Sequence, residues 1–179
     1  MNVRRRQKSL DARRAEHAEV TDPSLVLAAA LRFLEARPRS TAEVRRRLLI
    51  RGYRSDLVEG CLDRLLDLGI LDDEAFARTW IESRDRARPR GERRLRSELR
   101  TKGIDRQVVD EALETRTAQQ PAADADAARR VLERHASSLA RVADSRARRQ
   151  RAYALLARSG FDSETAIEAI TVMLEESNG

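Results

Sequence analysis

The stretch Leu99-Arg100-Thr101-Lys102-Gly103-Ile104 decides the fold, because the chain repeats its pattern. Equivalent stretches occur at residues 48–53 and 156–161. In each copy a leucine lies four positions before a glycine, and a large apolar residue follows that glycine directly. Glycine readily adopts the left-handed conformation that ends many helices, and the next apolar side chain packs back on the last turn. The repetition therefore predicts a helix end at Gly52, Gly103 and Gly160.

A second helical pattern follows each of these glycines. Apolar or small residues stand six, nine and ten positions after the glycine, a spacing that places them on one face of a helix. Ser55, Asp105 and Asp162 precede them and can cap the new helix by accepting its free N–H groups. The core positions predicted in this way are Val58, Cys61 and Leu62, then Val109, Ala112 and Leu113, then Ala166, Ala169 and Ile170.

A further helix is expected before each of these pairs. The first covers about residues 25–36, with Leu27, Leu31 and Leu34 on one side, and a capping box at Ser40-Thr41-Ala42-Glu43 opens the helix after it. The second begins at Asp72-Asp73-Glu74, acids suited to a helix start. We expect its core side to carry Phe76 and Trp80. The third begins near Asp124 and aligns Ala128, Val131, Leu132, His135 and Leu139.

The predicted fold class is all-α, with three tandem three-helix repeats that form an elongated, curved body. Many Arg, Ala, Leu and Glu residues, with aromatic residues at only 3%, agree with helices throughout. The expected repeats cover residues 24–71, 72–115 and 122–177. Residues 1–22 are expected to form a polar, basic arm that is helical in part at most, and residues 116–123 a linker.

Positive charge is concentrated at the same place in each repeat. The formal net charge is +6, and all but Lys8 and Lys102 of the cationic residues are arginines. Residues 37–54, 84–106 and 140–158 each carry a large cationic excess, while the chain between them is net acidic. Most charge runs are solvated helix faces. A matching excess in three repeats favours instead a basic stripe on one concave face, which would bind phosphates without base specificity and with strong salt dependence.

The sequence lacks the residues that disulfide-stabilised, zinc-binding, nucleotide-binding or nucleophilic proteins require. A single cysteine, Cys61, excludes an internal disulfide and fits a reducing compartment, and we interpret it as a core residue. Cys61, His17 and His135 cannot build a structural zinc site, and no phosphate-binding glycine loop or nucleophile motif occurs. We interpret Asp72-Asp73-Glu74 as capping residues rather than metal ligands. The chain has no apolar run long enough to span a bilayer and no secretory signal at its start, so we expect a cytoplasmic, monomeric protein that is not an enzyme.

Three stretches resemble a known family. Residues 30–40, with Glu43-Val44, Leu48 and Arg51-Gly52-Tyr53, resemble the opening repeat of the RecX regulatory proteins. Leu68-Gly69-Ile70-Leu71-Asp72-Asp73-Glu74-Ala75-Phe76-Ala77 is similar to that family's most recognisable stretch. Gly91 with residues 94–104 resembles its second repeat. The last third matches by spacing only, because Arg158-Ser159-Gly160-Phe161 stands where a basic residue next to the glycine is usual.

The resemblance implies three tandem repeats that lie in the groove of a RecA–DNA filament and modulate, usually inhibit, recombination and ATP hydrolysis. It implies no cofactor. The expected partners are the RecA filament and single-stranded or duplex DNA, contacted through phosphates. Two alternatives are a helical regulator that acts directly on duplex DNA and a helical-repeat adaptor for another protein. The candidate contact residues are Arg45, Arg46, Arg51, Arg93, Arg94, Arg96, Lys102, Arg148 and Arg149.

Overall fold

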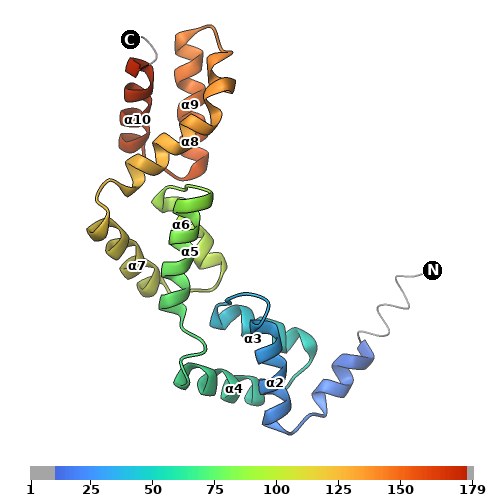
Figure 1. Ribbon diagram of the computed structural model, residues 1–179. Helices are drawn as coiled ribbons and strands as arrows, with labels where there is room; N and C mark the ends of the chain where they lie inside the picture. Colours follow the sequence, from blue (N-terminus) through green and yellow to red (C-terminus); the bar gives the residue numbers. More distant parts are fainter. Residues whose placement is uncertain (1–10, 177–179) are drawn as a thin grey trace, which may run out of the picture. The chain divides into compact units, whose positions relative to one another are not determined.

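A computed structural model describes residues 11–176, and these residues form helices joined by short loops, with no strand among them (Figure 1). The all-α prediction is therefore confirmed. After a helical stretch at residues 11–18 come α2 (Pro23–Leu34), α3 (Thr41–Arg51), α4 (Ser55–Asp67), α5 (Asp73–Ala87), α6 (Glu92–Thr101), α7 (Arg106–Gln119), α8 (Ala123–Ala140), α9 (Ser145–Ser159) and α10 (Ser163–Glu176). None of the described helices combines the length and apolarity needed to cross a bilayer.

The glycine pattern is confirmed at all three positions. Gly52, Gly103 and Gly160 have φ angles of +100°, +79° and +92°, in the left-handed region. The apolar residue after each glycine is buried, and so is the leucine four positions before it. The predicted core positions of the following helices are buried as well, except that Ala169 is only partly buried. The repeated motif thus fixes where these helices end and which face they bury.

The chain forms two compact units, of which the first contains residues up to Phe76 together with Lys102–Ile104. Its core lies between α2, α3 and α4. On α2 the fully buried side chains are Val26, Ala29 and Ala30. Of the predicted leucines, Leu27 and Leu34 are partly buried against this core and Leu31 is exposed, so the prediction was wrong at Leu31. Small residues on α2 allow a close approach of α4. Hydrophobic periodicity favours the larger leucines as core residues, because it does not take the distance between the two helices into account.

Of the two helix caps predicted for this unit, the one at Ser40 is confirmed and the one at Ser55 is wrong. Ser40 forms the predicted capping box: its hydroxyl accepts from the Glu43 N–H, and the Glu43 side chain accepts from the Ser40 N–H. The cap expected at Ser55 is wrong, because α4 already includes Ser55 and Arg54 holds the cap position without a side-chain bond. The side chain of Arg54 pairs instead with Asp56 at 2.7 Å.

The predicted N-terminal arm is helical in part over its described residues, as expected. Residues 11–18 are helical, and the backbone of Arg14 passes so close to Gly52 that a Cβ on Gly52 would lie 2.5 Å from the Arg14 carbonyl oxygen. The ring of His17 stacks on Tyr53 with a centroid distance of 4.3 Å. Residues 1–10 of this arm lie outside the described residues. The described segment therefore packs on the left-handed turn after α3.

The second unit contains residues 77–101 and everything from Asp105 onward. One cluster of apolar side chains joins α8, α9 and α10. Asp105 and Asp162 cap α7 and α10 as predicted, each accepting a backbone N–H. His135, predicted for the core of α8, is exposed, and its Nδ1 lies 2.9 Å from the Val131 carbonyl oxygen.

The N-terminus of α6 meets the C-terminus of α9 within this unit. The Gly91 N–H donates to the Ser159 carbonyl at 3.1 Å, and the Arg93 N–H donates to the Gly160 carbonyl at 3.2 Å. A Cβ on Gly91 would lie 2.4 Å from the Gly160 oxygen, so both glycines are needed for this approach. The contact ties the helices after Pro89 to the C-terminal cluster.

The linker predicted for residues 116–123 is wrong over its first half. Helix α7 continues through Gln119, and Arg116 is buried, 8% exposed. Only the short turn from Gln120 to Ala122 separates α7 from α8. A Gln-Gln-Pro sequence favours a loop by local rules, but a long-range ion pair of Arg116 holds this region in place. The division into three repeats stays a prediction.

Candidate nucleic-acid interface

The nine candidate cations fall in both units. Helix α3 carries Arg45, Arg46 and Arg51, and Lys102 lies in the segment that belongs to the same unit. The second unit holds the others, with Arg93, Arg94 and Arg96 on α6 and with Arg148 and Arg149 on α9. All but Lys102 are therefore fixed by the backbone of a helix, which is a rigid support for a binding surface.

Two candidates of the first unit make internal ion pairs. Arg45 donates to both carboxylate oxygens of Glu59, from Nε at 2.9 Å and from Nη2 at 2.8 Å. The hydrogen bonds that Arg45 donates to Glu59 raise the pKa of Arg45, although the pair is largely solvated. The Nζ of Lys102 lies 2.8 Å from Glu43. Both side chains are thus partly neutralised before any partner arrives.

The candidates on α6 differ among themselves. Arg94 lies 3.4 Å from Glu98 one turn later, and Arg96 lies 2.7 Å from Glu92 and also pairs with Asp110 on α7. Arg93 is exposed and has no ion pair with a described acid. Of the three, Arg93 carries the least compensated charge.

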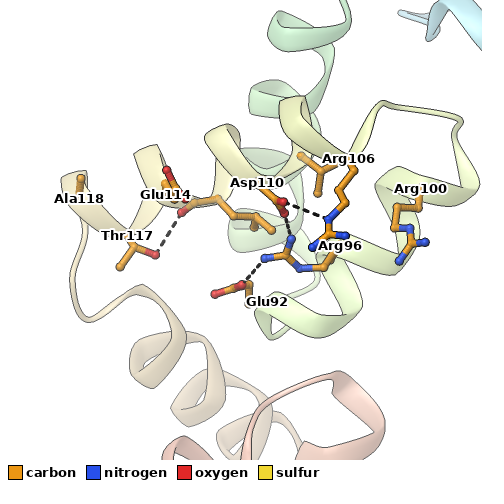
Figure 2. A pocket seen from close by; sticks show the side chains of 10 residues that line it. Glu92, Arg96, Arg100, Arg106, Asp110, Glu114, Thr117 and Ala118 are labelled. Atoms are coloured by element: carbon orange, nitrogen blue, oxygen red, sulfur yellow. Dashed lines mark hydrogen bonds and ion pairs between the residues drawn. The ribbon is translucent and has the colours of Figure 1, made fainter.

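A groove between α6 and α7, with a volume of about 880 Å³, contains Arg96 at its centre (Figure 2). Figure 2 shows the Arg96 guanidinium between Glu92 and Asp110, with Arg106 directed at the same aspartate. Three arginines and three carboxylates line the groove, so their formal charges cancel; they are Arg96, Arg100, Arg106, Glu92, Asp110 and Glu114. Such a groove lacks the excess positive charge that a polyanion requires.

Five candidates have no ion pair with any described acid. Arg46, Arg93 and Arg149 are exposed, and Arg51 and Arg148 are half-buried. Arg148 is held by a hydrogen bond from its Nε to the Val142 carbonyl at 3.1 Å. The uncompensated charge thus lies at separate points of α3, α6 and α9.

Arg149 borders a second groove, of about 460 Å³, between α9 and α10. Its lining combines Arg146 and Arg149 with the apolar side chains of Tyr153 and Ile167, which are 38% and 59% exposed. The Tyr153 hydroxyl is hydrogen-bonded to Ser163 at 3.0 Å, which holds the ring in place. Cationic and apolar groups side by side suit contact with a protein as well as with phosphates.

The structure separates the α6 candidates from those on α9. A Cβ on Gly160 would lie 2.3 Å from the Arg94 Cβ, so the start of α6 touches the end of α9. Arg149 precedes Gly160 by three helical turns, a distance of roughly 16 Å along the axis. The second unit therefore presents two groups of arginines rather than one cluster.

A polar cluster surrounds Glu98, which the sequence pattern did not predict. Glu98 accepts hydrogen bonds from Arg84 at 2.7 Å and from the Trp80 indole at 3.1 Å, and Arg94 also faces it. Burial alone would raise the pKa of Glu98, but these cationic and hydrogen-bonding neighbours outweigh it and hold that pKa below its usual range. Trp80 was predicted as a core residue and is only half-buried, because its N–H requires this partner.

Two further arginines outside the candidate set lie beside an aromatic ring. The guanidinium groups of Arg39 and Arg47 lie 4.2 Å and 5.4 Å from the centroid of Phe33. No sequence pattern predicts this pair, because the ring belongs to α2 and the cations to the turn before α3 and to α3 itself. The one sequence feature that points to Arg39 and Arg47 is the excess of arginine in residues 37–54.

Metal and thiol chemistry have no site among the described residues. No group of three His, Cys, Asp or Glu residues there could hold a metal ion. Asp72 caps α5 by accepting the Ala75 N–H, so the capping interpretation is confirmed for Asp72. Asp73 accepts the Thr41 N–H at the start of α3. Cys61 is buried, 5% exposed, and burial raises the pKa of its thiol.

Comparison with known proteins identifies the family. The first three-helix domain of RecX matches residues 27–65, and the second matches residues 72–113. The Regulatory protein RecX of Mycobacterium sp. (strain KMS) is 38% identical over 148 residues, covering 80% of this chain and 79% of the relative. The chain belongs to the RecX family. The RecX of Prosthecochloris aestuarii is 32% identical over 155 residues and is covered to 97% of its length.

Solved RecX structures have the same fold. A crystal structure of RecX from Lactobacillus salivarius matches with a TM-score of 0.68 and 21% identity, covering 83% of this chain and 94% of the other. A second crystal structure, of a regulatory protein RecX, matches with a TM-score of 0.74 and 22% identity over 83% of this chain and 73% of the other. RecX proteins are regulatory proteins by name, and the two family domains cover α3 and α6, which carry most of the candidate cations.

Proposed function

We propose that this protein binds the RecA–DNA filament and inhibits the recombinase and its ATPase activity, without catalysing a reaction and without a cofactor. The observation that carries the proposal is the combination of RecX membership with arginines that no described acid neutralises, at Arg46, Arg93 and Arg149. These arginines lie on three different helices, so binding through them would engage several points of one polyanionic partner. We further propose that the protein acts in the cytoplasm as a monomer.

In this proposal, contacts between arginines and DNA phosphates account for the affinity for the filament and for the inhibition of its ATPase activity. Each arginine that neutralises a phosphate releases a counterion, so binding weakens as the salt concentration rises. Several weak contacts in one chain together bind far more tightly than each alone. A ligand that prefers one conformation of the filament shifts it toward that state and opposes the cycling that ATP hydrolysis requires.

The test is the ATPase activity of RecA on single-stranded DNA, titrated with this protein at a low and a high salt concentration. The proposal predicts inhibition that saturates at low salt and is much weaker at high salt. If the ATPase rate stays unchanged at low salt over concentrations at which the protein binds the DNA, inhibition of the recombinase is the wrong function.

A helical adaptor for another protein is the second candidate, and one observation favours it. The groove between α9 and α10 exposes Tyr153 and Ile167 in a lining that also holds two arginines, which suits a protein segment better than bare phosphates. A variant with Ile167→Glu and Tyr153→Ser separates the two functions. Loss of partner binding with intact DNA binding would favour the adaptor.

A further inference from the structure

The turn between α2 and α3 places two arginines on one aromatic ring. The Cζ atom of Arg39 lies 4.2 Å from the centroid of the Phe33 ring, and that of Arg47 lies 5.4 Å from it. Both distances fall within the range of cation–π attraction, which is stronger for partly desolvated cations. The ring therefore fixes two guanidinium groups that come from different segments of the chain.

Neither guanidinium has an ion pair with a described acid. The Nε of Arg39 is buried and makes no hydrogen bond among the described residues, so the ring and not a carboxylate holds this side chain. Burial and the nearby positive charges of Arg37 and Arg47 keep the pKa of Arg39 below its usual value. Two like charges are thus held close together, and the nearby charge that opposes their repulsion is that of Glu43, which lacks an ion pair with either of them.

Glu43, the acid that pairs with cations at this turn, is already engaged. Glu43 accepts from the Nζ of Lys102 at 2.8 Å, from Arg37 at 3.2 Å and from the Ser40 N–H at 3.4 Å. The pKa of Glu43 is lowered, because the bonds and charges of Lys102 and Arg37 outweigh the effect of burial. Glu43 is therefore a fixed anion that serves two other cations, and Arg39 and Arg47 remain in excess.

We propose that Arg39 and Arg47, held on Phe33, form a binding site for the phosphodiester backbone of a nucleic acid. The planar fork of a guanidinium matches two oxygens of a phosphate, and stacking on a ring orients that fork in advance. A bound phosphate would also relieve the repulsion between the two cations. The site lies outside the candidate residues discussed above and deepens the proposed function by adding a DNA contact in the first unit.

The charge balance favours a nucleic acid over an acidic protein segment. Four cations lie at this turn, namely Arg37, Arg39, Arg47 and Lys102. Of the acids around them, Glu43 binds Arg37 and Lys102, Asp73 accepts the Thr41 N–H, and Glu35 is exposed. A polyanion with evenly repeated charge suits such an excess, and the phosphate and sugar of DNA accept at least about half of all protein–DNA hydrogen bonds. Arg39 and Arg47 would accordingly position the strand without reading its sequence.

The test measures binding of a fluorescent oligothymidylate to the full chain by anisotropy, over a series of salt concentrations and without any recombinase. The double variant Arg39→Gln/Arg47→Gln is compared with Arg54→Gln/Arg64→Gln, which removes the same charge from the same unit. The slope of log K against log salt should decrease by about 1.4 in the first variant, since each phosphate contact on a single strand contributes about 0.7. The matched variant should keep the original slope.

Equal slopes for the two variants would overturn the proposal, because the effect would then be one of net charge alone. The variant Phe33→Leu is a second test that keeps both positive charges, and it should weaken oligonucleotide binding severalfold. Unchanged binding would contradict the role of the ring. If the first variant loses binding of polyglutamate but not of the oligonucleotide, the site serves an acidic protein. Because no recombinase is present, failure here leaves the RecA ATPase test unaffected, and the reverse also holds.

Discussion

The guanidinium of Arg116 lies 2.6 Å from the carboxylate of Asp124, and this ion pair joins the end of α7 to the start of α8. The same guanidinium donates two hydrogen bonds to Asp85 on α5, at 2.8 Å and 2.9 Å. Asp124 also accepts the Glu92 N–H at the start of α6. One buried arginine thus connects four helices of the second unit, and its hydrogen bonds to the two aspartates outweigh burial and raise its pKa.

Replacing Arg116 by alanine should destabilise the protein strongly. The change leaves Asp85 and Asp124 without their cation in a largely buried site, and breaking such a pair costs about 3 kcal/mol. Urea unfolding measures the loss. Arg54→Ala, which removes an exposed pair with Asp56, is the control and should leave the unfolding midpoint unchanged. Equal effects of the two substitutions would mean that Arg116 does not hold these helices together.

Two glycines should respond in opposite directions to alanine. Gly160 has a φ of +92°, and a Cβ there would meet the Arg94 Cβ at 2.3 Å, so Gly160→Ala should cost at least about 2 kcal/mol. Gly60 lies inside α4 with nothing within 4 Å of a new Cβ, so Gly60→Ala should stabilise by about 0.5–1 kcal/mol. Thermal unfolding of both variants measures the two signs. A tolerated alanine at position 160 would contradict the close contact of α6 with α9.

Glu98 should make stability depend on pH in the acid range. Its pKa is lower in the folded chain than in the unfolded one, because Arg84 and Trp80 favour the ionised form enough to outweigh burial. The stabilisation is therefore complete above the ordinary glutamate pKa and is lost as the pH falls through the lowered one. Glu98→Gln should cost about 1–3 kcal/mol at neutral pH and progressively less toward acid.

Fluorescence of Trp80, the single tryptophan of the chain, follows this unfolding directly. The control is Glu114→Gln on α7, an exposed acid for which the structure shows no ion pair with a described cation. A difference between Glu98→Gln and the original chain that stays constant from neutral to acid pH would show that ionisation of Glu98 does not stabilise the fold.

The sequence predicts features that depend on neighbours along the chain. Gly103, its preceding Leu99 and its following Ile104 obey local rules of helix termination, and all three behave as expected. The Ser40 capping box is equally local. Such positions are predictable because the atoms that satisfy them lie within one or two turns.

Features that depend on distant helices could not be predicted in this way. His135 has the right spacing for the core of α8 but is exposed, and Arg116 lies in a segment of polar character but is buried. Among the candidate contacts, Arg45 and Arg93 look alike in sequence. Only the structure shows that Arg45 pairs with Glu59 while Arg93 has no described acid as partner.

Charge reversal of the uncompensated arginines tests the central claim most directly. Arg46→Glu/Arg93→Glu/Arg149→Glu is compared with Arg32→Glu/Arg64→Glu/Arg129→Glu, which changes the net charge equally at exposed positions outside the three basic segments. The measurement is the protein concentration that half-inhibits the RecA ATPase on single-stranded DNA. We predict an increase of at least roughly tenfold, or 1.4 kcal/mol of binding free energy, for the first variant only. Full inhibition by the first variant at the original concentration would contradict the claim that these arginines bind the filament.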